Sequence, residues 1–137
     1  MPLKFEKLEV WQLRLDYIDH ICEIGNELPR SEEYNLRSQM ARAATSGALN
    51  IAESSTSQTD AEQARFWGMG IRSLLETVAC QHLINRREYL QGTNSLRQAY
   101  RRAEILTAKL HSMLKSIAPE QPWLREESPI CETEVEG

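Results

Sequence analysis

The stretch of sequence that decides the fold is residues 39–53, QMARAATSGALNIAE. Its polar side chains recur every three or four positions, which places them on one face of a helix. This polar stripe consists of Gln39, Arg42, Ser46, Asn50 and Glu53. A neighbouring stripe is rich in small side chains and consists of Leu36, Met40, Ala43, Gly47 and Ile51. Because small side chains let two helix axes come close, this second stripe predicts a tightly packed helix–helix interface.

The polar stripe supports two interpretations. In the first, its side chains form an interhelical hydrogen-bond network, in which Glu76 of the following helix takes part, because polar groups inside a protein must be paired. In the second, the stripe is a contact site for a ligand or a nucleic acid. The small residues beside the stripe favour the packing interpretation.

The rest of the chain outlines three more helices. We expect helices over residues 5–27, from residue 31 or 32 to residue 53, over residues 59–90 and over residues 94–117. Ser31 is the expected N-cap of the second helix. Thr59 and Glu62 form a capping box for the third helix, which Gly92 ends. Long helices with short connections and no strand pattern predict an all-α fold, an antiparallel up-down-up-down four-helix bundle.

Two of the expected helices carry more apolar surface than a single bundle buries. The first helix has two apolar stripes. One stripe consists of Leu8, Trp11, Leu15, Ile18 and Cys22, and the other of Val10, Leu13, Tyr17, Ile21 and Ile24. The third helix is two-sided in the same way. Because large exposed apolar patches mark interfaces, we predict a homo-oligomer that assembles through helix faces, with the second of these stripes as the oligomer interface.

The charge of the chain changes at about residue 118. Residues 1–118 hold 15 of the 16 Lys and Arg and 14 of the 20 Asp and Glu, a net charge of +1, whereas residues 119–137 carry a net charge of −5. Pro119, Pro122 and Pro129 also lie in this last segment. We therefore predict one bundle domain, residues 1–118, followed by an acidic flexible tail, residues 119–137.

The last expected helix carries five basic side chains against one acidic side chain, Glu104. Because the guanidinium fork matches the geometry of phosphate, this helix offers a candidate phosphate-binding face. The candidate residues, including two arginines that precede the helix, are Arg86, Arg87, Arg97, Arg101, Arg102, Lys109 and Lys115. The alternative is an ordinary solvated face.

The sequence shows no catalytic constellation. His20, His82 and His111 lack the spacing of a zinc site or of a Glu-x-x-His pair, so we expect no metal, no cofactor and no enzyme activity. The three cysteines have no paired spacing, which is typical of reduced thiols. No segment approaches the about 20 apolar residues of a membrane span. We expect a cytoplasmic protein without a membrane contact or a small-molecule substrate.

Several segments together resemble one known family. They are Phe5-Glu-Lys-Leu-Glu-Val-Trp-Gln12, Leu28-Pro29, Tyr34-Asn-Leu-Arg-Ser-Gln39, Arg42-Ala-Ala44, Ser46, Asn50-Ile-Ala-Glu53 and Ser73-Leu-Leu-Glu76. Their combination is similar to the four-helix bundle proteins encoded in intervening sequences of bacterial 23S ribosomal RNA genes, also called the S23 ribosomal protein family. The resemblance covers residues 5–117.

The resemblance carries implications for assembly and partners. It implies a small bundle that forms a homopentamer. Related bundles are accessory subunits of reverse transcriptases, which implies RNA, DNA or a polymerase as a partner. We therefore expect a non-enzymatic oligomeric bundle that associates with nucleic acid or with a nucleic-acid enzyme. The alternative is a protein-binding scaffold without nucleic-acid contact.

Overall fold

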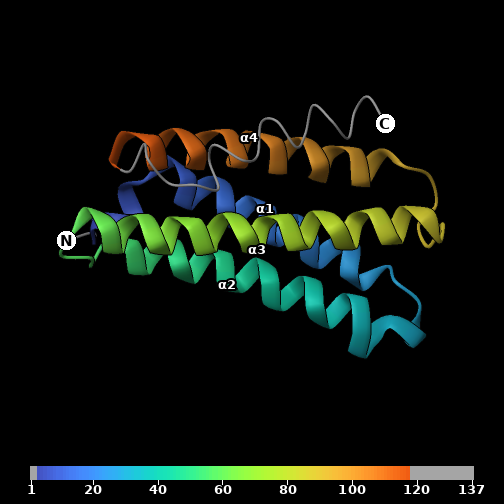
Figure 1. The fold of residues 1–137 in the computed structure, drawn as a ribbon. Coiled ribbons are helices and arrows are strands. Elements are labelled where there is room, and N and C mark those ends of the chain that lie inside the picture. The colour runs from blue at the N-terminus through green and yellow to red at the C-terminus, as the bar shows by residue number, and fades with distance from the viewer. Residues whose placement is uncertain (1–2, 118–137) are drawn as a thin grey trace, which may run out of the picture.

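The computed structural model describes residues 3–117, and the regular structure in that range is entirely helical. The four α-helices are α1 (Glu9–Asn26), α2 (Ser38–Ser54), α3 (Asp60–Arg86) and α4 (Asn94–Ile117). They lie side by side, and the chain runs away from its N-terminal end along α1, returns along α2, and repeats this course with α3 and α4 (Figure 1). The prediction of an all-α chain with four helices is confirmed, whereas the predicted acidic tail lies outside the described residues. None of the helices within residues 3–117 combines the length and the hydropathy that a membrane-spanning helix needs.

The helix ends follow the sequence signals in part. The hydroxyl of Thr59 accepts a hydrogen bond from the backbone N–H of Glu62 at 3.1 Å, so the predicted N-cap of α3 at Thr59 is confirmed, without the return bond of a capping box among the described residues. The end of α3 is earlier than expected, because Glu88 adopts a left-handed backbone conformation with a φ of 54°. Gly92, with a φ of 83°, therefore lies in the connection to α4 rather than at the end of α3. A 3-10 helix, Lys4–Lys7, precedes α1 as a separate turn.

The entry into α2 differs from the prediction. Before α2 come a 3-10 turn, Arg30–Glu32, and a π-helical turn, Glu33–Arg37. The side chain that caps these turns is Glu32, which accepts hydrogen bonds from the backbone N–H of Leu36 at 3.5 Å and from the hydroxyl of Tyr89 at 2.7 Å. The hydrogen bond from Tyr89 lowers the pKa of Glu32. The prediction of Ser31 as N-cap is wrong, because a residue from beyond α3 holds Glu32 in the capping position.

The core of the bundle contains the α1 stripe that we predicted as an oligomer interface. Val10, Tyr17, Ile21 and Ile24 are all buried among the four helices, and Leu13 is half-buried against them. Their prediction as interface residues is therefore corrected. The other stripe of α1, from Leu8 to Cys22, lies half-buried or exposed on the outside. Helical periodicity identifies both apolar stripes. Which of them faces the core depends on how the helix packs against its neighbours, and the periodicity does not contain that information.

The small-residue stripe of α2 is buried as predicted. All of its members, Leu36, Met40, Ala43, Gly47 and Ile51, are buried, and α2 packs closely against α3. At Gly47 there is no space for a side chain. A Cβ atom at this position would lie 1.5 Å from Nη2 of Arg14, so the guanidinium of α1 occupies the space that any larger residue would need.

Candidate functional site

The basic residues of α4 do not form one continuous face. Arg97 and Arg101 border a pocket between α4 and α3. Lys109 lies toward α1 and forms an ion pair with Glu9. The positive charge of Arg102 affects a side chain of α1 as well, because it helps to lower the pKa of His20. The predicted phosphate-binding set is therefore divided between two sides of the helix, and the structure brings only Arg97 and Arg101 together in a cavity.

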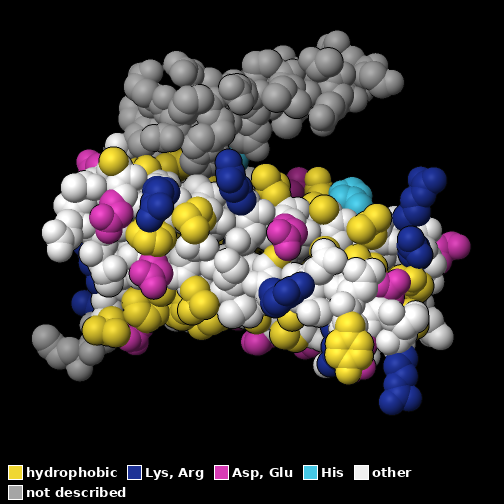
Figure 2. Space-filling view, turned by 60° about the horizontal axis from the view of Figure 1, so that its bottom comes forward, with side chains coloured by type: hydrophobic (Ala, Val, Ile, Leu, Met, Phe, Trp, Pro, Cys, Tyr) yellow, Lys and Arg dark blue, Asp and Glu magenta, His cyan; other side chains and the backbone are white. Residues whose placement is uncertain are grey.

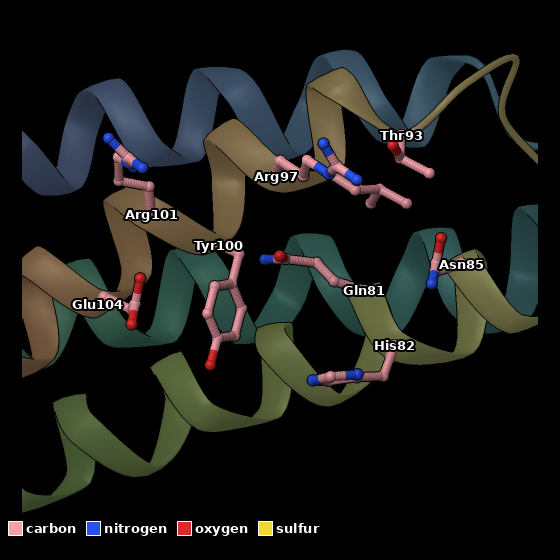
Figure 3. A pocket seen from close by; sticks show the side chains of 9 residues that line it. Gln81, His82, Asn85, Thr93, Arg97, Tyr100, Arg101 and Glu104 are labelled. Atoms are coloured by element: carbon pink, nitrogen blue, oxygen red, sulfur yellow. The ribbon is translucent and has the colours of Figure 1, made fainter.

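The pocket between α3 and α4 has a volume of about 410 Å³. Its lining combines two guanidinium groups with aromatic and amide side chains, as Figure 3 shows. The lining residues are Gln81, His82, Asn85, Thr93, Leu96, Arg97, Tyr100, Arg101 and Glu104. A volume of this size lies within the range typical of small-molecule sites. Arg97, Arg101 and Glu104 together give the lining a formal net charge of +1.

A chain of buried hydrogen bonds fixes the orientation of Gln81 at the base of this pocket. The hydroxyl of Thr77 donates to the carbonyl oxygen of Leu74 at 2.6 Å, so the hydroxyl of Tyr17 donates to Thr77, also at 2.6 Å. Nε2 of Gln81 in turn donates to the Tyr17 hydroxyl at 2.6 Å. Oε1 of Gln81 is left buried with no hydrogen-bond partner among the described residues. Figure 3 shows the Gln81 side chain extending toward Tyr100.

Two aromatic rings form one wall of the pocket. The rings of His82 on α3 and Tyr100 on α4 pack edge to face, with centroids 6.2 Å apart and an interplanar angle of 83°. Tyr100 remains 45% exposed, so much of its ring is open to solvent. Arg97 and Arg101 lie on the same side of α4, one turn apart, and neither forms an ion pair with another described residue. The pocket thus offers open ring surface beside two cations that form no ion pair within residues 3–117.

Only part of this pocket could be predicted from the sequence. Arg97 and Arg101 were predicted, whereas Gln81, His82, Asn85 and Tyr100 were not. A signal for Tyr100 was present, because Arg97, Tyr100, Arg101 and Glu104 follow the spacing of a single helix face. Arg86, Arg87 and Lys115 are exposed and do not line the pocket.

The polar stripe of α2 lies mostly at the surface. Gln39, Arg42, Ser46 and Glu53 are exposed, as is Glu76 on α3, and only Asn50 is buried. The contact with α3 within the described chain is a hydrogen bond of 3.4 Å between Ser73 and Ser46, while Asn50 donates to the carbonyl oxygen of Ser46 at 2.9 Å. The predicted network through Arg42, Glu53 and Glu76 does not form in the described chain, because these long side chains reach solvent.

The stripe instead borders a shallow hollow of about 650 Å³ between α2 and α3. Leu49, Phe66 and Met69 give this hollow an apolar floor, and Arg42 and Glu53 lie in its lining. Leu49 is 58% exposed and Met69 is 41% exposed. Within residues 3–117, no group of three His, Cys, Asp or Glu side chains is placed to hold a metal ion.

The fold and these two surfaces define a small helical bundle with a cationic, aromatic pocket on one side and an apolar hollow on another. The chain belongs to the family of 23S rRNA-intervening sequence proteins, whose family model matches residues 6–112. It is similar in structure to a protein of unknown function from the S23 ribosomal protein family of Bacteroides thetaiotaomicron, with a TM-score of 0.71 and 21% sequence identity, covering 77% of this chain and 98% of that one. No curated protein matches the chain. The predicted family resemblance is confirmed.

Proposed function

We propose that this protein is a non-enzymatic, antiparallel four-helix bundle that self-associates and binds nucleic acid through the α3–α4 pocket. The observation that carries the proposal is the position of Arg97 and Arg101, which lie together at a pocket and lack an ion-pair partner among the described residues. Phosphate groups are the natural counter-ions of such arginines, because a guanidinium binds two phosphate oxygens at once.

Self-association is supported by the apolar hollow between α2 and α3. On the face that Figure 2 shows, hydrophobic side chains gather in patches between charged ones. Leu49 and Met69 are exposed side by side with Phe66 in the lining of this hollow, and contiguous apolar surface of this kind marks interfaces. Burying this hollow against a second copy removes it from water. We propose a closed homo-oligomer, and a pentamer as its size.

The nucleic-acid proposal is tested by titrating labelled RNA with the full chain at two salt concentrations. Binding through phosphates weakens as salt rises, because bound counter-ions are released. We expect Arg97→Ala/Arg101→Ala to weaken binding at low salt by at least tenfold. The matched control is Arg30→Ala/Arg65→Ala, which removes two exposed positive charges that lie outside the pocket.

Two results would contradict nucleic-acid binding through the pocket. One is an equal loss of affinity in the control variant, which would indicate a general charge effect. The other is the absence of any RNA binding at low salt, which would leave the protein-binding scaffold as the better account of the apolar hollow.

The oligomer proposal is tested by light scattering of the full chain. We expect a mass near five times the 15.8 kDa of one chain. Leu49→Glu/Met69→Glu places two charges in the apolar hollow and is expected to dissociate the oligomer while the helices remain folded. Ile105→Glu on the exposed face of α4 serves as the control. A monomeric wild-type protein at micromolar concentration would contradict the proposal.

A further inference from the structure

The α3–α4 pocket has the composition of a site for one nucleotide. We infer that it takes a single unstacked nucleotide, either free or as one unit of a single strand. This inference rests on the proposed function, since it assigns the chemical class of ligand to the same pocket. It is carried by three features of the pocket lining: a buried acceptor, an exposed aromatic ring and two guanidinium groups. Neither the acceptor nor the guanidinium groups have a partner among the described residues.

The acceptor of Gln81 selects for a ligand that donates a hydrogen bond. Because Nε2 of Gln81 is held by the hydroxyl of Tyr17, the carboxamide keeps Oε1 as its free end. A buried acceptor without a partner is costly, so a ligand that supplies an N–H gains more here than it would at an exposed site. Amino and imino groups on the edge of a nucleobase are donors of this kind.

Tyr100 supplies a surface on which a base stacks. Its ring is 45% exposed, and the edge-to-face contact with His82 holds it in place beside the pocket. Stacking on an aromatic side chain is available to every base, because each base has a π-face. Gln81 and Tyr100 line the same pocket, and in Figure 3 the side chain of Gln81 extends toward Tyr100. We therefore place the base on the ring with its polar edge directed at the carboxamide.

The charged side chains of the pocket match a single phosphate group. Arg97 and Arg101 attract the phosphate, while Glu104 on the same face of α4 opposes it. The net charge of +1 equals the charge that one monoanionic phosphodiester neutralises, and the two guanidinium groups supply the hydrogen-bond donors for its oxygens. The cavity of about 410 Å³ has room for one nucleotide. A base inside a duplex is stacked and paired, so it does not enter without unpairing.

The experiment measures binding of three probes to the full chain: adenosine 5′-monophosphate, a single-stranded oligoadenylate, and an RNA duplex of the same length. We expect the single strand to bind at least tenfold more tightly than the duplex at the same salt concentration. Tyr100→Ala is expected to weaken binding of the single strand and of the monophosphate at least tenfold. Tyr100→Phe keeps the ring and is expected to bind as the wild type does.

A second variant tests the charge of the pocket. Glu104→Gln removes the one carboxylate of the lining and is expected to tighten binding of adenosine 5′-monophosphate by about threefold. Both Tyr100 and Glu104 are exposed, so these substitutions leave the core intact. Circular dichroism verifies that each variant is helical.

The outcomes separate this inference from the proposed function. If RNA binding depends on Arg97 and Arg101 but not on Tyr100, or if duplex and single strand bind equally, the nucleotide site is wrong and nucleic-acid binding stands. If the monophosphate binds in a manner that depends on Tyr100 while RNA does not bind, the site holds a free nucleotide and the proposed function is wrong. If none of the three probes binds, both are wrong.

Discussion

Arg14 is the most unusual residue of the core. It is fully buried, none of its three guanidinium nitrogens has a hydrogen-bond partner among the described residues, and its guanidinium lies where a side chain of Gly47 would be. Burial lowers the pKa of Arg14 to about 10, so the side chain is still charged at neutral pH. The guanidinium carbon lies 6.0 Å from the centroid of the Tyr17 ring, but a buried charge without hydrogen-bond acceptors still destabilises a fold. Gly47 and Arg14 therefore constrain each other.

The first prediction concerns this pair. In an ordinary helix, replacing glycine by alanine stabilises by up to about 1 kcal/mol. Gly47→Ala is instead expected to destabilise the protein by about 1–3 kcal/mol, because the enclosed guanidinium of Arg14 must move and displace its neighbours. In the background of Arg14→Ala, the same substitution is expected to be stabilising. Urea unfolding of the four proteins of this double-mutant cycle measures the coupling, and additive effects would show that the two residues do not compete for space.

The second prediction concerns His20 on α1. Its side chain is buried, and Nε2 lies 3.0 Å from the hydroxyl of Ser95. Burial, and then the positive charge of Arg102, lower the pKa of His20 below its usual value of 6.5. As the pH falls below about 6.5, His20 is protonated in the unfolded chain before it is protonated in the folded one. The free energy of unfolding should therefore decrease over this range.

Thermal unfolding at pH 7.5, 6.5 and 5.5 measures this dependence. His20→Gln removes the titrating group and should reduce the loss of stability over this range. An unchanged pH dependence in that variant would mean that another group is responsible.

The two sides of helix α1 are expected to respond differently to the same substitution, because one is buried in the core and the other faces outward. Ile21→Glu is expected to unfold the protomer, because it places an unpaired charge among fully buried side chains. Leu15→Glu, on the outer side of the same helix, is expected to keep the helical signal in circular dichroism. A folded but dissociated Ile21→Glu protein would restore the original assignment of this stripe to the oligomer interface.

Features that depend on local sequence could be predicted, whereas those that depend on distant contacts could not. The bounds of α4 were predicted correctly because its apolar residues form one narrow stripe and Asn94 follows a turn. The two stripes of α1 were both recognised, but their orientation was not, because it depends on packing with other helices. The cap at Glu32 depends on Tyr89, 57 residues away, and the orientation of Gln81 depends on Tyr17, 64 residues away. Contacts over such separations leave no local trace in the sequence.

At the scale of the whole molecule, the charge difference between the bundle and residues 119–137 leads to a further prediction. This segment has a net charge of −5 and follows the helix that carries Arg97 and Arg101. A tethered anion competes with phosphate at a high effective concentration. We expect a chain of residues 1–118 to bind RNA more tightly than the full chain at low salt. Equal affinities of the two proteins would show that the segment does not compete.

We propose above that nucleic acid contacts the protein at the pocket between α3 and α4. Ultraviolet cross-linking of the full chain to single-stranded RNA, followed by mass spectrometry of the peptides, identifies the side chain in contact with a base. We expect a cross-linked nucleotide on Tyr100. Cross-links confined to other aromatic residues, such as Trp11 on the outside of α1 or Phe66 in the α2–α3 hollow, would contradict it.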